Sequence, residues 1–263
     1  STLPQPGSSL LLGIVLGVKE NMDKTFFDDL RKTGTLHVIA ASGMNVSMVG
    51  GFLFSVLTLF FKRQLATTLA LMGIVFYAAL AGFEPSIVRA SIMGGLAFSA
   101  QILGRQNLPI LTLFLVGFLM LFIDPPLLFD IGFQLSILAT LGLITLKPLF
   151  DQRIRFDALT TTLSAQLATL PILLANFGSF SILSVFANAL LLWTVPILMV
   201  FGGMGALFGI IVEPLAKPFL FLSLPFLIFF EGVVHIFAGW PGLLSIENFP
   251  AVLGVGYYLL LIS

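Results

Sequence analysis

The chain has 263 residues, of which 58% are hydrophobic and only 9% are charged. A soluble domain is typically about half apolar and about a quarter charged, so this composition excludes an ordinary water-soluble fold and predicts an all-α, polytopic transmembrane bundle in contact with lipid. Basic and acidic residues balance at twelve each, no cysteine is present, and there are only two histidines. We therefore expect no global attraction for nucleic acid, no disulfide, no metal and no cofactor.

The first 33 residues are expected to precede the membrane bundle. The apolar run Leu10–Val18 is too short to cross a bilayer and predicts an interfacial or re-entrant segment rather than a signal peptide. The charged segment Lys19–Lys32 is expected to be an external loop. Because the chain opens with Ser1 rather than Met, we expect a piece of a longer protein in which residues 1–263 form a single transmembrane domain, with the membrane bundle at residues 34–263.

Nine apolar stretches predict about nine membrane spans, each ideally about 17 to 25 residues long. The seventh is too long for one straight pass and contains Pro196, Gly202 and Gly203, so a broken or hinged helix is expected there. The expected spans are His37–Phe61, Leu65–Gly82, Pro85–Gly104, Leu108–Ile123, Phe129–Leu146, Ala158–Ala175, Ile182–Val212, Phe219–Ala238 and Pro250–Ile262.

The cations in the connecting loops alternate along the chain. Loops after odd-numbered spans hold seven Lys or Arg residues, whereas loops after even-numbered spans hold none. The positive-inside rule then places the ends of odd-numbered spans in the cytoplasm. The four cations of Lys19–Lys32, which would lie outside, are matched by four carboxylates. The seven loop cations are Lys62, Arg63, Arg105, Lys147, Arg153, Arg155 and Lys217.

Polar side chains of the predicted spans gather at their outer ends. A charge at mid-bilayer costs roughly 2.5 to 3.5 kcal/mol on insertion scales, so these groups are expected to share one polar vestibule. Helical spacing aligns several of them, such as His37, Ala41 and Asn45. For any single stripe, hydrogen bonding to a neighbouring helix is the alternative. The vestibule candidates are His37, Ser42, Asn45, Glu84, Arg89, Asp124, Asp130, Gln134, Gln166, Ser184 and Asn188.

Two ionisable groups in these spans need a partner. Arg89 requires a carboxylate or water so near the membrane, and it either sets a gate or fixes neighbouring spans through an ion pair. The candidate carboxylates are Glu84, Asp124 and Asp130. His235 lies four residues after Glu231 and is expected to bond to it, with a proton relay as the alternative.

Four sequence blocks follow one another in a characteristic order. They are TGTLHVIAASGMNVSMVGG at Thr33–Gly51, GFEPSIVRASIM at Gly82–Met93, IDPPLLFDIGFQLSILATLGL at Ile123–Leu143 and QLATLPILLANFGSFSILSVFAN at Gln166–Asn188. In the same order they resemble the His-Leu-Leu-Ala-x-Ser-Gly, Pro-Ser-x-x-Arg-Ala, Asp-Pro…Gly-Phe-Gln-Leu-Ser and Ala-Thr-Leu-Pro blocks of the competence domain in the ComEC family of bacterial DNA-uptake proteins. The resemblance runs from about Leu10 to past Pro196.

The resemblance implies an inner-membrane channel that passes single-stranded DNA from periplasm to cytoplasm during natural transformation. It further implies a periplasmic DNA receptor, and a cytoplasmic motor or single-stranded-DNA-binding proteins. Many members also carry an OB-like domain and a nuclease domain, and neither occurs in these 263 residues. Where the family often has a second histidine in the first block, this chain has Asn45.

The loop cations have two interpretations under this hypothesis. They either draw an emerging strand inward at a cytoplasmic exit or serve only as topology anchors. The exit candidates are Lys62, Arg63, Arg105, Lys147, Arg153 and Arg155.

Two other classes of protein stay open as alternatives. A small-solute secondary transporter would be favoured by inverted repeats with a broken helix in each half, and only one broken segment is expected here. An intramembrane enzyme would need a second histidine at ligand spacing or a nucleophile paired with a base, and no such pairing is recognisable. Because a lining of small polar side chains suits weak, multi-site conduction, the channel is the preferred hypothesis and no enzymatic activity is expected.

Overall fold

The computed structural model describes residues 3–18, 22–39, 42–102, 104–177, 179–181, 183–240, 243–245 and 250–262. Helices make up almost all of the described chain. The exception is a small sheet in which β1 (Ser179–Ser181) pairs antiparallel with β2 (Leu243–Ser245). The helices are α1 (Gly7–Leu16), α2 (Lys24–Lys32), η1 (Leu36–Val38), α3 (Gly43–Phe60), α4 (Arg63–Leu80), α5 (Pro85–Ile102), α6 (Pro109–Ile123), η2 (Pro125–Phe129), α7 (Ile131–Thr145), α8 (Lys147–Asp151), α9 (Asp157–Phe177), α10 (Leu183–Leu191), α11 (Thr194–Ile211), α12 (Glu213–Ala238) and α13 (Ala251–Ile262).

Each predicted apolar stretch corresponds to one helix or to two consecutive helices, but the count of nine spans is not confirmed. Among the described residues, five helical segments are long and apolar enough to cross a membrane, and the bent pair α10–α11 makes a sixth. α6 has 15 residues, which at about 1.5 Å each gives roughly 22 Å against a hydrocarbon core of about 30 Å. The five segments are Leu36–Phe60, Arg63–Leu80, Ile131–Asp151, Asp157–Asn176 and Pro214–Ala238. A helical, multi-pass membrane bundle is compatible with this result.

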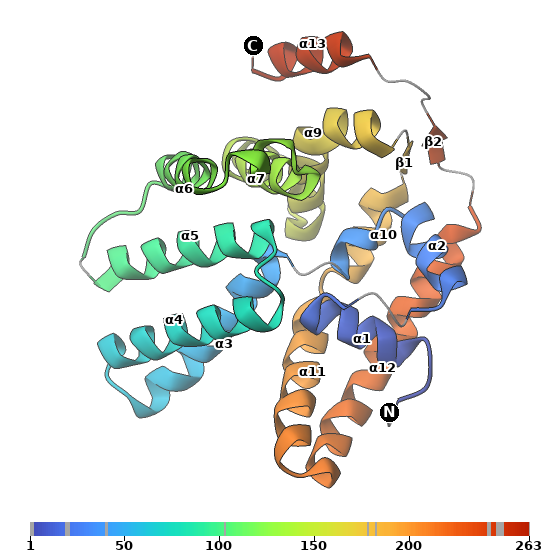
Figure 1. Ribbon diagram of the computed structural model, residues 1–263. Coiled ribbons are helices and arrows are strands. Elements are labelled where there is room, and N and C mark those ends of the chain that lie inside the picture. Colours follow the sequence, from blue (N-terminus) through green and yellow to red (C-terminus); the bar gives the residue numbers. More distant parts are fainter. Residues whose placement is uncertain are drawn as a thin grey trace.

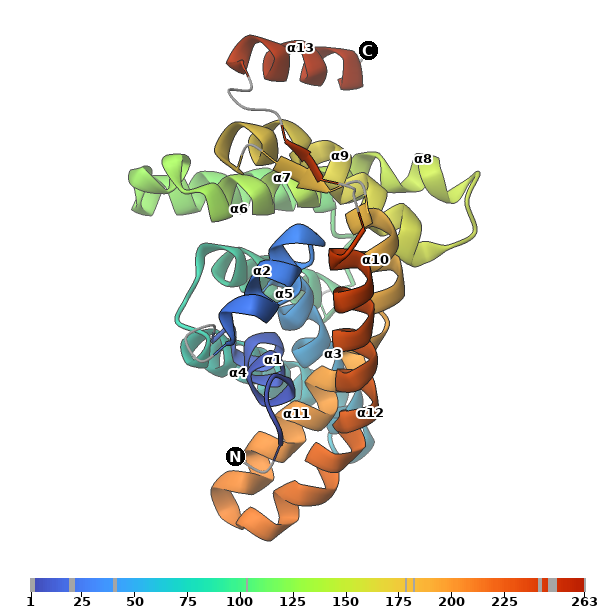
Figure 2. The ribbon, with the colours of Figure 1, turned by 90° about the vertical axis from the view of Figure 1, so that its right-hand side faces the viewer.

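The helices form three packed groups (Figure 1). α3 packs against α4 and α5, α7 packs against α6 and α9, and α11 and α12 form a long antiparallel hairpin crossed by α1. In the turned view of Figure 2, α13 lies beyond α9, at the end of the molecule opposite the α11–α12 hairpin. The hydroxyls of Tyr257 and Tyr258 hold α13 there, each donating over 2.9 Å to a backbone carbonyl of α9.

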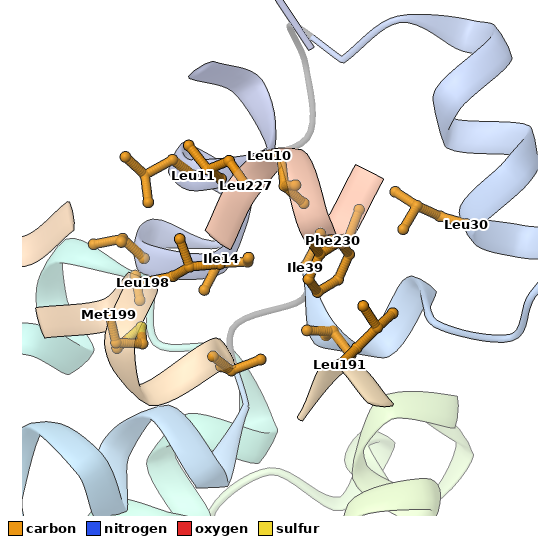
Figure 3. Packing of buried hydrophobic residues seen from close by; sticks show 14 of the residues in the cluster. Leu10, Leu11, Ile14, Leu30, Ile39, Leu191, Leu198, Met199, Leu227 and Phe230 are labelled. Atoms are coloured by element: carbon orange, nitrogen blue, oxygen red, sulfur yellow. The ribbon is translucent and has the colours of Figure 1, made fainter. Parts of the chain in front are cut away.

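The main hydrophobic cluster forms around α1. Leu10 and Ile14 are fully buried and pack with Leu198 of α11 and with Leu227 and Phe230 of α12 (Figure 3). An interfacial helix would keep its apolar face toward lipid, whereas α1 is enclosed by protein on almost every side. α1 is thus part of the protein core, and its predicted interfacial or re-entrant position in the membrane stays a prediction.

The predicted external loop contains a helix. α2 carries Phe26 and Leu30 four residues apart on one face, and both are buried against the main cluster. That apolar pair in an otherwise charged segment explains why the segment docks as a helix on α12 instead of remaining a loop. Lys19 and Glu20, which entered the charge balance, lie outside the described residues, as does Ala41 of the first polar stripe.

The break expected in the seventh stretch is present, but it lies upstream of the predicted hinge. α10 and α11 are bent by 48° between Leu191 and Thr194. Pro196 falls in the first turn of α11, where its missing N–H removes no intrahelical hydrogen bond. α11 then runs unbroken through Gly202 and Gly203, so the glycines are not the hinge. Gly202 instead permits close packing, since a Cβ there would lie 2.7 Å from Val15 of α1.

Candidate functional site

The structure brings three vestibule candidates together around Ser184, where α9, β1 and α10 meet. Gln166 Nε2 donates to Ser184 Oγ over 2.7 Å, and Ser184 Oγ donates to the carbonyl of Ser181 over 2.6 Å. Asn188 follows Ser184 by one turn and is likewise buried. Gly34, in the left-handed region at φ +68°, closes the group, because a Cβ there would lie 2.7 Å from Ser184 Cβ. We call these five residues the Ser184 cluster.

Three buried oxygens of the Ser184 cluster have no hydrogen-bond partner in the described structure. They are Gln166 Oε1, Ser181 Oγ and Asn188 Oδ1. The network fixes the orientation of the Gln166 amide: Ser184 gives its single proton to a carbonyl and must accept from Nε2. Buried oxygens without a donor are costly. The cluster is therefore suited to receive water or another hydrogen-bond donor.

Among the described residues, His37 contacts the Ser184 cluster through the backbone of Gly34 and not through the side chains of Gln166, Ser184 and Asn188. Its side chain is exposed, and Nδ1 lies 3.1 Å from the carbonyl oxygen of Gly34. That contact connects η1 to the preceding glycine turn. The polar first stripe is thus divided, with His37 near the surface and Asn45 fully buried.

Asn45 and Tyr77 hold the C-terminal end of α1. Asn45 Nδ2 donates to the carbonyl of Ile14 over 2.9 Å, and Tyr77 Oη donates to that of Val15 over 3.0 Å. Ser42 Oγ contacts Asn45 Oδ1 at 3.3 Å. Because the last carbonyls of a helix have no intrahelical donor, these two side chains satisfy groups that would otherwise be buried unpaired. Sequence reasoning missed Tyr77. Its signal was a phenol inside an apolar span, which must find a polar partner.

Arg89 lies between α5, α7 and the start of α3. Its Nε donates to Ser136 Oγ over 2.8 Å, and Nη1 lies 3.2 Å from Met93 Sδ. Nη2 points toward α3, lying 3.2 Å from the position that a Cβ on Gly43 would occupy. The residue is only 6% exposed. Ser136, which sequence reasoning did not select, is thus the side chain that orients the guanidinium.

The expected carboxylate partner of Arg89 is not found among the described residues, where ion pairs join Lys147 to two aspartates and His235 to Asp29. Asp130 Oδ1 instead accepts from the backbone N–H of Phe133 over 2.6 Å and caps α7. Glu84 and Asp124 also lie at helix ends, before α5 and after α6. Arg89 contacts Ser136 of α7 instead, and nearness in sequence to Glu84 did not predict that contact between helices.

Gln134 has a local role at the same turn as Asp130. Its Nε2 donates to the carbonyl of Leu128 over 2.7 Å, at an exposed position. Asp130 and Gln134, which were predicted to form a polar stripe, therefore stabilise the turn that connects η2 to α7. Both side chains form hydrogen bonds to backbone groups near this turn.

His235 bonds to α2 and not to Glu231, contrary to the sequence prediction. Its Nδ1 lies 2.7 Å from Asp29 Oδ2. The docking of α2 on α12 brings Asp29 to His235, which the sequence could not show across 206 residues. Beside this contact is an open pocket of about 430 Å³, lined in part by Asp23 and Glu231.

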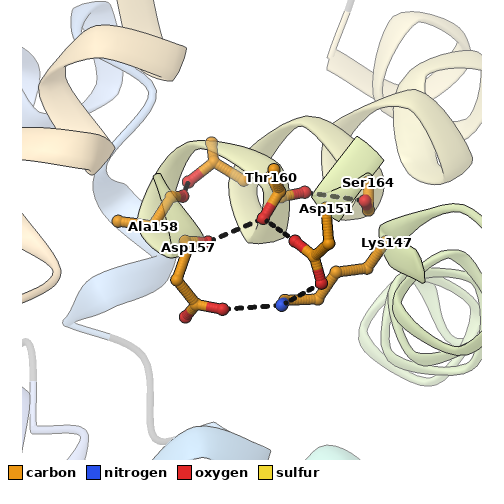
Figure 4. Close-up of polar contacts among 7 residues, drawn as sticks. Lys147, Asp151, Asp157, Ala158, Thr160 and Ser164 are labelled. Carbon is orange, nitrogen blue, oxygen red and sulfur yellow. Dashed lines mark hydrogen bonds and ion pairs between the residues drawn. The ribbon is translucent and has the colours of Figure 1, made fainter. Parts of the chain in front are cut away.

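One predicted exit cation is engaged in a local network. Lys147 Nζ lies 2.9 Å from Asp151 Oδ2 and 2.6 Å from Asp157 Oδ1, and Thr160 Oγ1 donates to Asp151 Oδ1 over 2.6 Å (Figure 4). The network ties α8 to the first turn of α9. The other five exit candidates are exposed and form no ion pair within the described residues: Lys62, Arg63, Arg105, Arg153 and Arg155.

The candidates therefore form separate hydrogen-bonded groups, and a single hydrated vestibule joining them stays a prediction. The Ser184 cluster, the α1-capping pair and the Arg89–Ser136 contact are each assembled from elements far apart in sequence. All three place polar side chains inside an otherwise apolar bundle.

Comparisons with known proteins find one family and several relatives that match most or part of this chain. The family model described as "Competence protein" matches residues 14–263. ComE operon protein 3 of Bacillus subtilis is 30% identical over 224 residues, which cover 83% of this chain and 28% of that protein. An uncharacterized protein of Aquifex aeolicus is 31% identical over 180 residues, covering 68% and 41%. Recombination protein 2 of Haemophilus influenzae is 31% identical over 135 residues, covering 48% and 17%. The chain thus spans less than half of each relative, and no solved structure matches it.

Proposed function

Since this chain belongs to the Competence protein family, we propose that it is the membrane part of a DNA-uptake protein that passes a single DNA strand across the bacterial inner membrane into the cytoplasm. The observation that carries the proposal is the family match, which takes in residues 14–263 and so nearly the whole chain. The helices long enough to cross a membrane support a multi-pass location. The receptor, motor, OB-like and nuclease partners belong to the same proposal.

The polar groups described above suit a conduit better than a tight binding site. A DNA strand carries one phosphate per nucleotide, and tight binding would require a row of cations along the path. Among the described residues, Arg89 is the cation that lies buried inside the bundle. The other buried polar side chains are neutral amides and hydroxyls, such as those of the Ser184 cluster. Conduction needs contacts that are weak and repeated. We infer that the chain guides a strand without holding it, and performs no catalysis.

A solute transporter is the second candidate, and the bend between α10 and α11 is the observation that favours it. Interrupted helices commonly line the binding sites of secondary transporters. A transporter of that kind would also need a matching interrupted helix in the first half of the chain. Among the described residues only the α10–α11 pair is bent in this way, so strand passage remains the better-supported function.

Uptake of labelled DNA by cells tests the proposal directly. Cells lacking the full-length gene are expected to bind labelled double-stranded DNA at their surface but to bring none of it into a nuclease-protected form. Expression of the full-length protein should restore protected label. Normal protected label in the deletion strain would remove DNA uptake as the function, and an accompanying defect in solute accumulation would point to the transporter.

The proposed orientation can be tested with single cysteines because this chain contains none of its own. We expect Arg153→Cys, in the turn after α8, to react with a membrane-impermeant maleimide only after cells are permeabilised, since positive loops stay inside. Leu128→Cys in η2, which is 53% exposed, should react in intact cells. Any cysteines elsewhere in the full-length protein are replaced first. The reverse labelling pattern would overturn the orientation and the placement of the exit cations.

A further inference from the structure

Pro171 lies inside α9 and removes one backbone hydrogen bond from that helix. Because proline has no N–H, the carbonyl four residues earlier, that of Leu167, has no donor within α9. α9 belongs to a segment that is long and apolar enough to cross a membrane. Lipid supplies no donor to a free carbonyl, and a proline is tolerated in a spanning helix where a neighbouring group does so. The Leu167 carbonyl therefore needs a partner from elsewhere in the chain.

That partner comes from α13. Tyr257 Oη donates to the Leu167 carbonyl over 2.9 Å, from 90 residues further along the chain. Tyr258 Oη donates over 2.9 Å to the next carbonyl, that of Ala168. In a regular helix the Ala168 carbonyl also accepts from the N–H four residues later, that of Ile172. Tyr257 thus replaces a missing donor, whereas Tyr258 adds a second one.

α13 is joined to the rest of the described molecule mainly through α9. It lies at one end of the molecule, and α9 is the helix against which it packs (Figures 1 and 2). Leu253 and Leu259 of α13 are 59% and 67% exposed, so the helix is covered on one side only. Segments with few buried contacts open locally at a smaller cost in free energy than the core does. The two tyrosine hydrogen bonds are therefore a large part of what keeps α13 on α9.

We propose that α13 is a strap that closes reversibly on α9, and that Pro171 creates its docking position by leaving the Leu167 carbonyl free. The paired tyrosines recognise that position through their hydroxyls. Gln166, which donates to Ser184, immediately precedes Leu167, so the closed strap is attached to α9 next to the Ser184 cluster. When the strap opens, the Leu167 carbonyl has no donor from α9 or from α13.

Hydrogen exchange of the full-length protein in detergent measures how often α13 opens. We expect Tyr257→Phe to speed exchange across Ala251–Ile262 about tenfold, because it leaves the Leu167 carbonyl without any donor. Tyr258→Phe should speed it only about threefold, because the Ala168 carbonyl keeps its donor within the helix. Exchange across α1, which lies in the main hydrophobic cluster, should stay native in both variants.

Pro171→Ala tests the part that the proline plays. The alanine supplies the missing N–H to the Leu167 carbonyl, so in this background Tyr257→Phe should speed α13 exchange only about threefold. Pro225→Ala is the matched control, because Pro225 also lies inside a helix, α12, but that helix carries neither tyrosine acceptor. In the Pro225→Ala background, the tenfold effect of Tyr257→Phe should persist.

Three results would overturn the inference. An undiminished effect of Tyr257→Phe in the Pro171→Ala background would break the link between the proline and the strap. Native exchange of α13 in both phenylalanine variants would show that the tyrosines do not hold it. Faster exchange throughout the molecule would show that α13 opens only together with the core. If Pro171→Ala does not fold, the two phenylalanine variants decide the question, and equal effects would contradict the vacant acceptor at Leu167.

Discussion

Replacing Gly142 with alanine is expected to push α7 away from α9 and to destabilise the protein by about 1 to 3 kcal/mol, toward the upper end. A Cβ on Gly142 would collide with the carbonyl oxygen of Ser164 and lie 2.6 Å from Ala168 Cβ. The first obstacle is backbone, which cannot rotate aside as a side chain does. Relief therefore requires a shift of a whole helix.

The consequence of Gly142→Ala extends to both polar groups of the site. α7 carries Ser136, which orients Arg89, and α9 carries Gln166, which donates to Ser184. Separation of α7 from α9 would therefore displace Ser136 relative to Gln166. We expect a lower thermal unfolding midpoint for the full-length protein in detergent, and reduced uptake of DNA in cells.

Gly94→Ala is the matched control, because the added Cβ would meet nothing within 4 Å and alanine favours the helix. Its unfolding midpoint should equal or exceed that of the native protein. If both alanine variants unfold at the native temperature, the close contact between α7 and α9 is absent from the folded protein.

The positions of the helices could be predicted from the sequence because the apolar runs are long and their ends are marked by proline or charge. α5 begins at Pro85 and α6 at Pro109, as the position of proline at a helix start leads one to expect. The number of membrane spans was less predictable. Length and composition tell a spanning helix from a buried one only when the run clearly exceeds the bilayer thickness.

The partners of the polar residues could not be predicted, since they depend on contacts between distant parts of the chain. Arg89 meets Ser136 across 47 residues, and His235 meets Asp29 across 206. Helical spacing reveals only which residues share a face of one helix. It correctly indicated that Ser184 and Asn188 lie together, but not that Gln166 and Gly34 complete their surroundings.

The role of a glycine is equally hard to predict from the sequence. Gly202 and Gly203 are neighbours in sequence, yet a Cβ on the first would meet α1 whereas one on the second would meet nothing within 4 Å. A hinge and a packing contact give the same glycine signal in a sequence. Only the arrangement of α1 against α11 distinguishes them.

Removal of the two side chains that cap α1 is the second change with a large expected effect. Asn45→Leu would leave the buried carbonyl of Ile14 without its donor, at a cost of about 1 to 3 kcal/mol. Tyr77→Phe removes the donor to Val15 and should cost about 1 kcal/mol. Because the two carbonyls are adjacent at one helix end, the double variant should depart from additivity. Thermal unfolding of the full-length protein in detergent measures all three variants.

Hydrogen exchange at α1 shows where that loss of stability falls. We expect faster exchange across Gly7–Leu16 in both single variants, with α13 unaffected, because α1 would open locally from the main cluster. Ser47→Ala is the control on α3, since Ser47 is exposed and its hydroxyl donates to the carbonyl of Gly43 in its own helix. Native exchange at α1 in Asn45→Leu would show that Asn45 does not hold this helix.

The same variants separate a capping role for Asn45 from a place in the lining of a conduit. A capping residue acts through the position of α1, so DNA uptake should fall in Tyr77→Phe as well as in Asn45→Leu, in proportion to the loss of folded protein. A lining residue acts on the strand itself, so Asn45→Leu would lower uptake at unchanged protein level while Tyr77→Phe would not. Asn45 is fully buried and donates to α1, and from this geometry we expect the first pattern.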